Sequence, residues 1–186
     1  MNYKPENPLI VQSDHTLLLE TMGPHFRAAR DALVRFAELV KSPEYVHTYR
    51  VTPLSLWNAA AAGVGVEEVL EALETWAKYD VPPNVPASIR ETMGRYGRLR
   101  LVSEDDVLAL RLESEDEILL TEVANTKTVM PWLGPQLSPN AIRVEAAHRG
   151  VLKQALTAAG HPVEDLAGYV DGEALEVCLS HHTRAG

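Results

Sequence analysis

The stretch that decides the fold is residues 48–112, which read TYRVTPLSLWNAAAAGVGVEEVLEALETWAKYDVPPNVPASIRETMGRYGRLRLVSEDDVLALRL. Thr52 followed by Pro53 is typical of a helix start, and Gly63 and Gly97 are typical of helix ends. Apolar spacing predicts three helices and then a two-stranded hairpin, over residues 53–62, 66–78, 84–96, 98–102 and 107–112. This order predicts a winged-helix-like module, an architecture that docks on nucleic acid or on protein.

In a winged helix the third helix reads the bases, so the residues on its outward face indicate whether this module binds DNA by sequence. The face opposite its apolar stripe holds Ala87, Glu91 and Gly94, which are small or acidic, and the expected hairpin turn is acidic too. The pattern therefore favours packing on a protein neighbour over base reading. Contact with the DNA backbone stays open, and the candidates, which could equally pair with nearby acids, are Arg90, Arg95, Arg98 and Arg100.

The segment before this module predicts a hairpin and a helix. Residues 9–12 and 16–20 are β-favouring runs separated by a turn-like Ser-Asp-His, and residues 46–51 suggest another short strand. Gly23 and Pro24 open a stretch of helical spacing that is expected to run to about residue 41.

The last third alternates between strand and helix signals, which indicates a small α/β unit. Its expected elements are two helices (116–125 and 148–159), a loop with one helical turn (126–140) and three strands (142–146, 166–170 and 174–179). The predicted fold class is thus α+β, with one domain over residues 1–112 and a second over residues 113–186.

Charge and composition narrow the functional classes. The 186 residues carry a net charge of −9, and residues 113–186, with 5 basic and 11 acidic side chains, hold −6 of it. Such a field repels phosphate, so any DNA contact needs local clusters of cations. No apolar run reaches the ~20 residues that span a bilayer, and a lone Cys178 excludes a disulfide framework. We therefore expect a cytoplasmic protein without membrane contact.

The sequence contains no common catalytic motif. The patterns GxxxxGK[ST], HExxH, GxSxG and GxGxxG are all absent, and His181-His182 and Cys178 lack the partners of a metal or nucleophile site. Trp132, which lies in a loop beside Pro131 and Gly134, is expected to be exposed and able to stack on a base or a partner. The cations of the last third that could accompany it on DNA are Lys127, Arg143, Arg149 and Lys153.

Six motifs in order resemble the N-terminal region of bacterial XPB-type DNA repair helicases. They read LIVQSDHTLLLE, RFAEL, HTYRVTPLSLWNAAAAG, ETMGRYGRLRL, RGVLKQAL and DLAGYVDGEAL, and they cover residues 8–179. In that family the region precedes a superfamily 2 motor that hydrolyses ATP and moves 3′ to 5′. The resemblance implies that residues 115–179 correspond to a damage recognition domain, which helps to sense or open distorted DNA.

The resemblance also implies partners and a division of labour. The expected partners are DNA, the helicase's own motor domains and a nuclease that acts with it in nucleotide excision repair. ATP and Mg²⁺ belong to the motor, whose motifs this chain lacks, so no cofactor and no catalytic residue are expected here. The chain is expected to be a truncated form of such a helicase. The rival hypotheses are a protein-interaction module and a stand-alone winged-helix transcription regulator.

Overall fold

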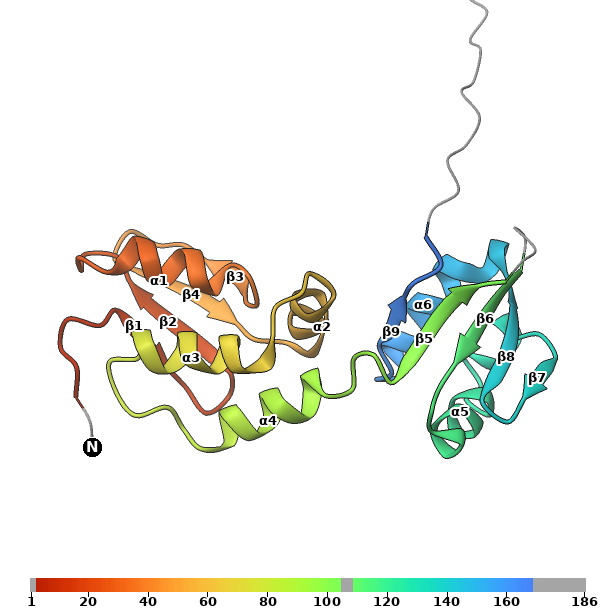
Figure 1. The fold of residues 1–186 in the computed structure, drawn as a ribbon. Coiled ribbons are helices and arrows are strands. Elements are labelled where there is room, and N and C mark those ends of the chain that lie inside the picture. The colour runs from red at the N-terminus through yellow and green to blue at the C-terminus, as the bar shows by residue number, and fades with distance from the viewer. Residues whose placement is uncertain (1–2, 105–108, 169–186) are drawn as a thin grey trace, which may run out of the picture.

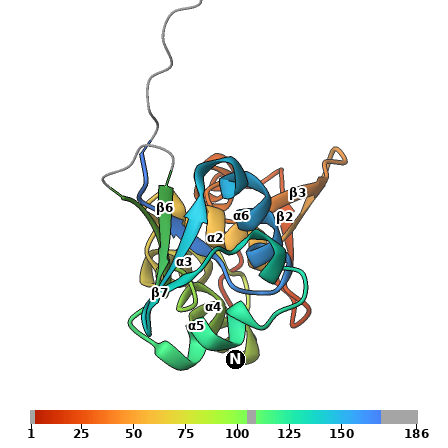
Figure 2. The ribbon, with the colours of Figure 1, turned by 90° about the vertical axis from the view of Figure 1, so that its right-hand side faces the viewer.

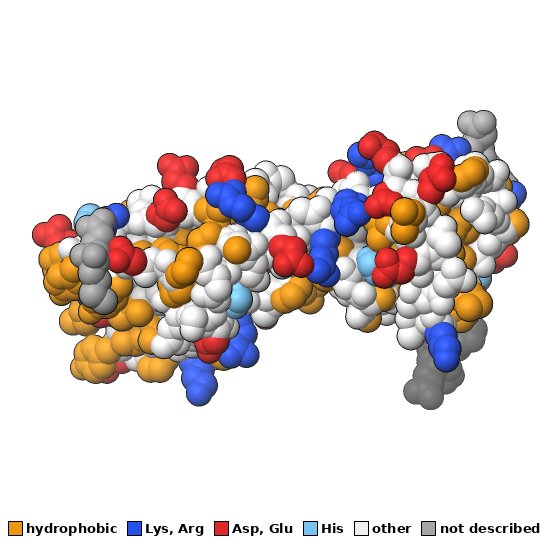
Figure 3. All heavy atoms as spheres, turned by 90° about the horizontal axis from the view of Figure 1, so that it is seen from below, with side chains coloured by type: hydrophobic (Ala, Val, Ile, Leu, Met, Phe, Trp, Pro, Cys, Tyr) orange, Lys and Arg blue, Asp and Glu red, His pale blue; other side chains and the backbone are white. Residues whose placement is uncertain are grey.

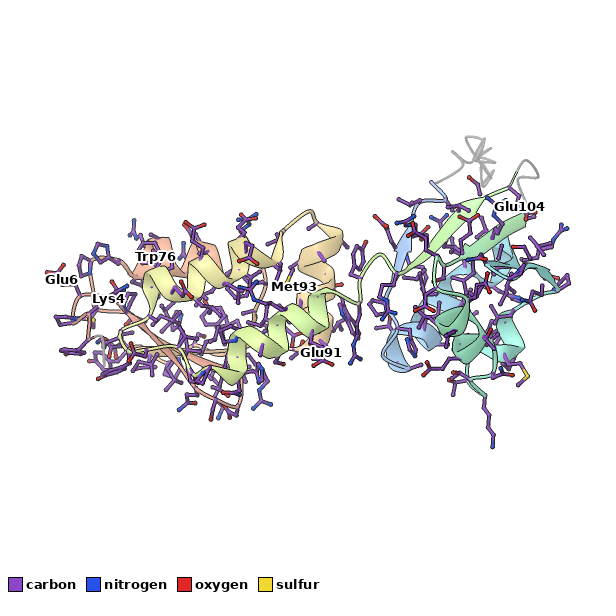
Figure 4. All side chains as sticks on the ribbon, turned by 60° about the horizontal axis from the view of Figure 1, so that its bottom comes forward. Lys4, Glu6, Trp76, Glu91, Met93 and Glu104 are labelled. Atoms are coloured by element: carbon purple, nitrogen blue, oxygen red, sulfur yellow. The ribbon has the colours of Figure 1, made fainter. Side chains whose placement is uncertain are left out.

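The computed structural model describes residues 3–104 and 109–168, and its architecture is α+β, as the sequence predicted. Two sheets lie in two lobes that the chain connects through residues 94–98 (Figure 1). In the space-filling view the two lobes lie end to end with a narrower waist between them (Figure 3). In Figure 4, Met93 marks the end of the first lobe at this crossing, and Glu104 lies at the far end of the second.

The first lobe contains a four-stranded antiparallel sheet covered by helices. Its strands are β1 (Leu9–Val11), β2 (Thr16–Glu20), β3 (Glu38–Lys41) and β4 (Val46–Arg50), in the order β1-β2-β4-β3. Its helices are α1 (Phe26–Leu33), α2 (Pro53–Ala61), α3 (Val66–Trp76) and α4 (Asn84–Met93). Period-two alternation turns Leu17, Leu19 and Tyr49 toward these helices, and all three are buried.

Local sequence signals fix the start of α2. The Thr52 side-chain oxygen accepts a hydrogen bond from the Ser55 backbone N–H at 3.0 Å, and the Ser55 hydroxyl accepts one from the Thr52 N–H at 2.9 Å. These reciprocal bonds satisfy two donors that the first turn leaves unpaired. The Trp57 indole N–H then donates to the Thr92 carbonyl at 2.9 Å, which ties α2 to α4.

The helix expected from residue 24 to about residue 41 is wrong in its second half. Helix α1 ends at Leu33, and the chain continues as β3, in which Glu38 pairs with Arg50 and Leu39 with Tyr49. The helical spacing of this segment is real, but the ladder with β4 supplies backbone hydrogen bonds at Glu38–Lys41 that a longer helix would forgo. Tertiary pairing thus overrides local periodicity here.

The second lobe contains a five-stranded sheet with both helices on one face. Its sequence of elements is β5 (Leu99–Ser103), β6 (Ala109–Glu113), α5 (Glu117–Ala124), a 3₁₀ turn (Met130–Trp132), β7 (Gln136–Ser138), β8 (Ala141–Glu145), a second 3₁₀ turn (Ala146–His148), α6 (Arg149–Ala158) and β9 (Val163–Asp165). The sheet order is β7-β8-β6-β5-β9. Leu101, Leu112 and Ile142 lie side by side in register and face Leu120 of α5 and Leu152 of α6 in one core.

The winged-helix arrangement is not confirmed, because the hairpin β5–β6 does not pack on the three helices. Strand β6 pairs with β8, strand β5 pairs with β9, and their leucines belong to the second core. The hydrophobic cores therefore change between Met93 and Leu99, earlier than the domain boundary expected after Leu112. The division into domains 1–112 and 113–186 stays a prediction that this packing does not favour.

The expected strand over residues 166–170 is also displaced. The strand of this region is β9, which pairs in parallel with β5, and Leu166, Ala167 and Gly168 follow it without strand structure. The remaining residues of that prediction, the strand expected over residues 174–179, and Cys178, His181 and His182 lie outside the described residues.

Because the two hydrophobic cores are separate, a mutation in one core should destabilise its own lobe and leave the other lobe unchanged. Leu73 is fully buried in the first core and Leu120 nearly so in the second. We expect Leu73→Ala to cost about 2–5 kcal/mol in the first lobe and Leu120→Ala a similar amount in the second. Amide hydrogen exchange should accelerate in β2 and β4 for the first variant and in β6 and β8 for the second. Equal acceleration of both sheets by either variant would contradict this.

Candidate functional site

The face of the second sheet that points away from α5 and α6 carries charged side chains. Arg100 lies opposite Glu113 in β6 and Glu164 in β9, and Arg111 lies opposite Arg143 in β8. Alternation along each strand places these groups on the face opposite the leucine core. The lobe is thus apolar on one side of its sheet and ionic on the other.

An open groove of about 1030 Å³ runs along this face, with walls formed partly by the crossing segment. Tyr96, Gly97 and Arg98 form the wall from the crossing, and β7 contributes Leu137 and Ser138. The charged lining residues are Arg98, Arg100, Arg111, Glu113, Glu115, Asp116 and Glu164, three cations and four carboxylates. The groove is therefore slightly acidic and, unlike a typical DNA-binding surface, has no excess of positive charge.

Every groove arginine already has a carboxylate partner. The Arg98 guanidinium donates to Asp116 at 2.8 Å, and Arg100 lies 3.3 Å from Glu115 and 3.6 Å from Glu164. Arg111 pairs with Glu113, two residues further along the same strand. A phosphate that entered this groove would have to displace these carboxylates or share their arginines.

Asp116 has a second role because it caps α5. One of its carboxylate oxygens accepts the backbone N–H groups of Ile118 and Leu119, each at 3.0 Å. The hydrogen bond from Leu119, together with those from Arg98 and Ile118, holds the pKa of Asp116 below its usual value. Asp116 therefore fixes Arg98 to the start of α5, and Arg98 is positioned by the fold itself.

The arginines of α4 and its end are paired in the same way. Arg90 bonds to Glu67 of α3, and this bond raises the pKa of Arg90. Arg95 donates to Glu91, one turn earlier, at 2.8 Å. The structure shows that both arginines pair with nearby acids, and their contact with the DNA backbone stays a prediction.

The predicted cations of the second lobe differ in their exposure. Lys127, after α5, and Arg143, on β8, are exposed. Arg149 and Lys153 of α6 instead hold Asp165, with Arg149 donating at 2.8 and 3.0 Å and Lys153 at 2.7 Å. The structure therefore does not bring the eight predicted cations and Trp132 together on one surface.

Trp132 is half-buried and not exposed as expected, and its stacking on a base or a partner stays a prediction. It packs against the second core, and its ring meets His148 edge to face with centroids 5.5 Å apart. The 3₁₀ turn Met130–Trp132 directs the indole inward, although Pro131 and Gly134 made the segment look like an open loop.

The sequence reasoning missed the acids that complete these pairs. Glu164 and Asp165 lie on β9, a three-residue strand that pairs in parallel with β5 across a long sequence separation. Burial raises the pKa of Tyr96 in the crossing, and Glu164 and Asp165 raise it further, so these acids also face the waist between the lobes. The sequence contains little signal for this strand, because Val163 is followed by two consecutive acids, Glu164 and Asp165, and the segment does not alternate.

Two negative findings concern the described residues only. Within residues 3–104 and 109–168, no three histidine, cysteine or acidic side chains converge as metal ligands would. No helix in the same ranges has the length and apolar character needed to cross a membrane.

The fold defines an α+β protein of two sheets with an ionic groove on one sheet face. The family model described as helicase conserved C-terminal domain matches residues 9–138. The chain belongs to this family.

Named relatives extend the match to nearly the whole chain. The DNA 3′-5′ helicase XPB of Kineococcus radiotolerans is 50% identical over 175 residues, which are 94% of this chain and 31% of that protein. The DNA 3′-5′ helicase XPB of Mycobacterium tuberculosis is 48% identical over 174 residues, 94% of this chain and 32% of that protein. The XPB subunit of general transcription and DNA repair factor IIH from Schizosaccharomyces pombe is 31% identical over 114 residues, 57% of this chain and 14% of that subunit. The chain thus spans about a third of the length of its bacterial relatives.

The cluster around Asp165 gives a testable pH dependence. Burial by itself would raise the pKa of Asp165, but the hydrogen bonds from Arg149 and Lys153 outweigh it and hold the pKa below its usual value. A lowered pKa in the folded state stabilises the fold above the unfolded-state pKa of about 3.9, and this stability is lost as the pH falls through the folded-state pKa.

We therefore expect Asp165→Asn to lower the free energy of unfolding by about 1–3 kcal/mol at pH 7. The difference from the wild type should shrink steadily below about pH 4, because the wild-type carboxyl is then protonated as well. Urea unfolding at several pH values measures this. Glu117→Gln is the control, because it removes an exposed carboxylate of the same lobe that is not part of the Asp165 cluster. A deficit for Asp165→Asn that is independent of pH would contradict the electrostatic account.

Proposed function

We propose that this chain is the non-catalytic N-terminal accessory region of an XPB-type 3′-5′ DNA helicase or translocase that acts in nucleotide excision repair. The observation that carries the proposal is the 48–50% identity over 94% of the chain to bacterial proteins named DNA 3′-5′ helicase XPB. In this proposal the region engages damaged or forked DNA and docks partners, and the ATP- and Mg²⁺-dependent motor lies elsewhere in the helicase. A cytoplasmic location and a nuclease partner belong to the same proposal.

The second lobe is the better candidate for DNA engagement. Its ionic sheet face carries Arg100, Arg111 and Arg143, and Lys127 extends the exposed cations of this lobe. Because the groove arginines are held by carboxylates, phosphate has to compete with internal partners. We therefore expect weak, salt-sensitive contact that supports a motor and does not hold DNA alone.

Partner docking is the second candidate, and the paired charges of the groove favour it. Fixed arginine–carboxylate pairs present both signs of charge in a set geometry, which suits recognition of a polar protein surface. This candidate predicts no salt-dependent affinity for DNA. The third hypothesis, a winged-helix transcription regulator, has lost the feature that motivated it, because the hairpin β5–β6 belongs to the other core.

A DNA titration separates the first two candidates. We expect the chain to bind forked DNA with a Kd in the micromolar range at low salt, more tightly than single-stranded or duplex DNA. Raising the salt from about 50 to 200 mM should weaken binding roughly tenfold if two phosphates are contacted. Fluorescence anisotropy measures both quantities. No binding below about 100 μM at low salt would refute DNA engagement and leave partner docking.

Matched variants locate the contact. Lys127→Ala and Arg143→Ala should each weaken binding to all three DNA forms and reduce the salt slope by about 1. Arg27→Ala, which removes an exposed arginine from α1 in the first lobe, is the control and should change neither. An equal loss of affinity from the control would mean that binding follows net charge and not a site on the second lobe.

A further inference from the structure

Arg100 lies on an interior strand of the second sheet, with its side chain on the open face. Its strand β5 is bordered by β6 and β9, and Arg100 is in register with Glu113 on one side and Glu164 on the other. Figure 2 looks onto the end of the second lobe and shows α5 and α6 on one side of β6, so these helices leave the groove face open. The sheet therefore holds the Arg100 guanidinium, which is 45% exposed, where an outside group can reach it.

The ion pairs of Arg100 are looser than the neighbouring pair of Arg98. The Arg98 Nη2 lies 2.8 Å from a carboxylate oxygen of Asp116, a normal length for a hydrogen bond between charged groups. The Arg100 Nη1 lies 3.3 Å from Glu115, and its Nε lies 3.6 Å from Glu164, which is beyond hydrogen-bond length. Of these two arginines, Arg100 thus loses less when a carboxylate partner leaves.

Glu115 has little other role in the fold. Its side chain is 89% exposed, and among the described residues its carboxylate has no hydrogen-bond or ion-pair partner besides Arg100. Other groups fix the backbone beside it, because the Ser114 hydroxyl donates to the Arg98 carbonyl at 2.9 Å and the Asn140 side chain donates to the Ser114 carbonyl at 3.0 Å. The Glu115 side chain can therefore rotate away from Arg100 while the backbone of the turn stays in place.

The other groove acids are more constrained. Asp116 also accepts the backbone N–H groups at the start of α5, so its departure would uncap the helix. The side chains of Glu113 and Glu164 are each 34% exposed, and Glu113 also pairs with Arg111. Among the described groove acids, Glu115 is thus the most exposed and the one whose release costs the fold least.

A carboxylate and a DNA phosphate present the same kind of acceptor to a guanidinium, oxygens that share one negative charge. We propose that Arg100 is a binding site for one backbone phosphate of DNA, and that the Glu115 carboxylate occupies this site in the free chain. When DNA binds, the phosphate replaces Glu115 on Arg100, and Glu115 turns into solvent. This inference rests on the proposed DNA engagement of the second lobe and adds a built-in competitor that limits it.

A gain of affinity is the consequence that distinguishes this proposal. Loss of the Glu115 charge frees Arg100, and it also leaves the groove with three cations and three carboxylates in place of four. Most substitutions at a binding site weaken binding, whereas a neutral side chain at position 115 should strengthen it.

The test is fluorescence anisotropy of the 186-residue chain with forked DNA at low salt. Glu115→Gln should lower the Kd about two- to fivefold, the worth of an exposed ion pair. Glu117→Gln is the matched control, because it removes the same charge two residues further along, where the exposed carboxylate has no ion-pair partner among the described residues. It should leave the Kd unchanged.

A double-mutant cycle assigns the gain to Arg100. Arg100→Gln should weaken binding by the wild type, and in the Arg100→Gln background the further change Glu115→Gln should tighten binding no more than Glu117→Gln does. Circular dichroism of each variant verifies folding.

The outcomes separate this proposal from the proposed function. A wild type that binds forked DNA while Glu115→Gln binds it no more tightly would overturn the phosphate site at Arg100 and leave DNA engagement standing. A gain that equals that of Glu117→Gln, or that persists in full without Arg100, would also overturn it, because net charge would then be the cause. Failure of both the wild type and Glu115→Gln to bind below about 100 μM would overturn both proposals.

Discussion

The constraint on which the arrangement depends is that the apolar face of the hairpin β5–β6 must be covered. Leu101 and Leu112 are fully buried, and α5 and α6 cover them, not the three helices that precede the hairpin. Because α5 and α6 cover the hairpin, the chain forms two cores, and residues 94–98 connect them. This arrangement also turns the opposite face of the sheet, with Arg100 and Arg111, toward solvent, so the ionic groove follows from the same packing.

Short sequence motifs correctly predicted the structural features that depend only on neighbouring residues. The Thr52–Pro53 start of α2, the β1–β2 hairpin and the glycine after α2 require only neighbours in sequence, and all are found. Long-range pairing controls the features that the sequence did not reveal. Strand β3 exists because β4 offers it a ladder, and β9 exists because β5 does. The sequence therefore showed which elements form more reliably than which core each one joins.

The same distinction between local signals and long-range contacts explains how much of the candidate site the sequence predicted. The arginines were recognisable in the sequence, but their ion pairs depend on acids that the fold brings close from elsewhere in the chain. Glu67 pairs with Arg90 in this way, and Asp165 pairs with Arg149. These pairs mean that the DNA contact we propose would be opposed both by long-range repulsion from a net charge of −9 and by the exchange of carboxylate partners for phosphate.

The two edges of the first sheet are covered unequally. One edge is closed by the chain itself at Ala77 and Lys78, and the other carries Leu39 and Val40 in the open. An apolar edge that remained unpaired would be an aggregation liability. The bulge between Leu39 and Lys41 and the flanking charges of Glu38 and Lys41 limit the length over which another strand could pair with this edge. The two lobes thus present different surfaces, an ionic sheet face on the second and an exposed edge strand with two apolar residues on the first.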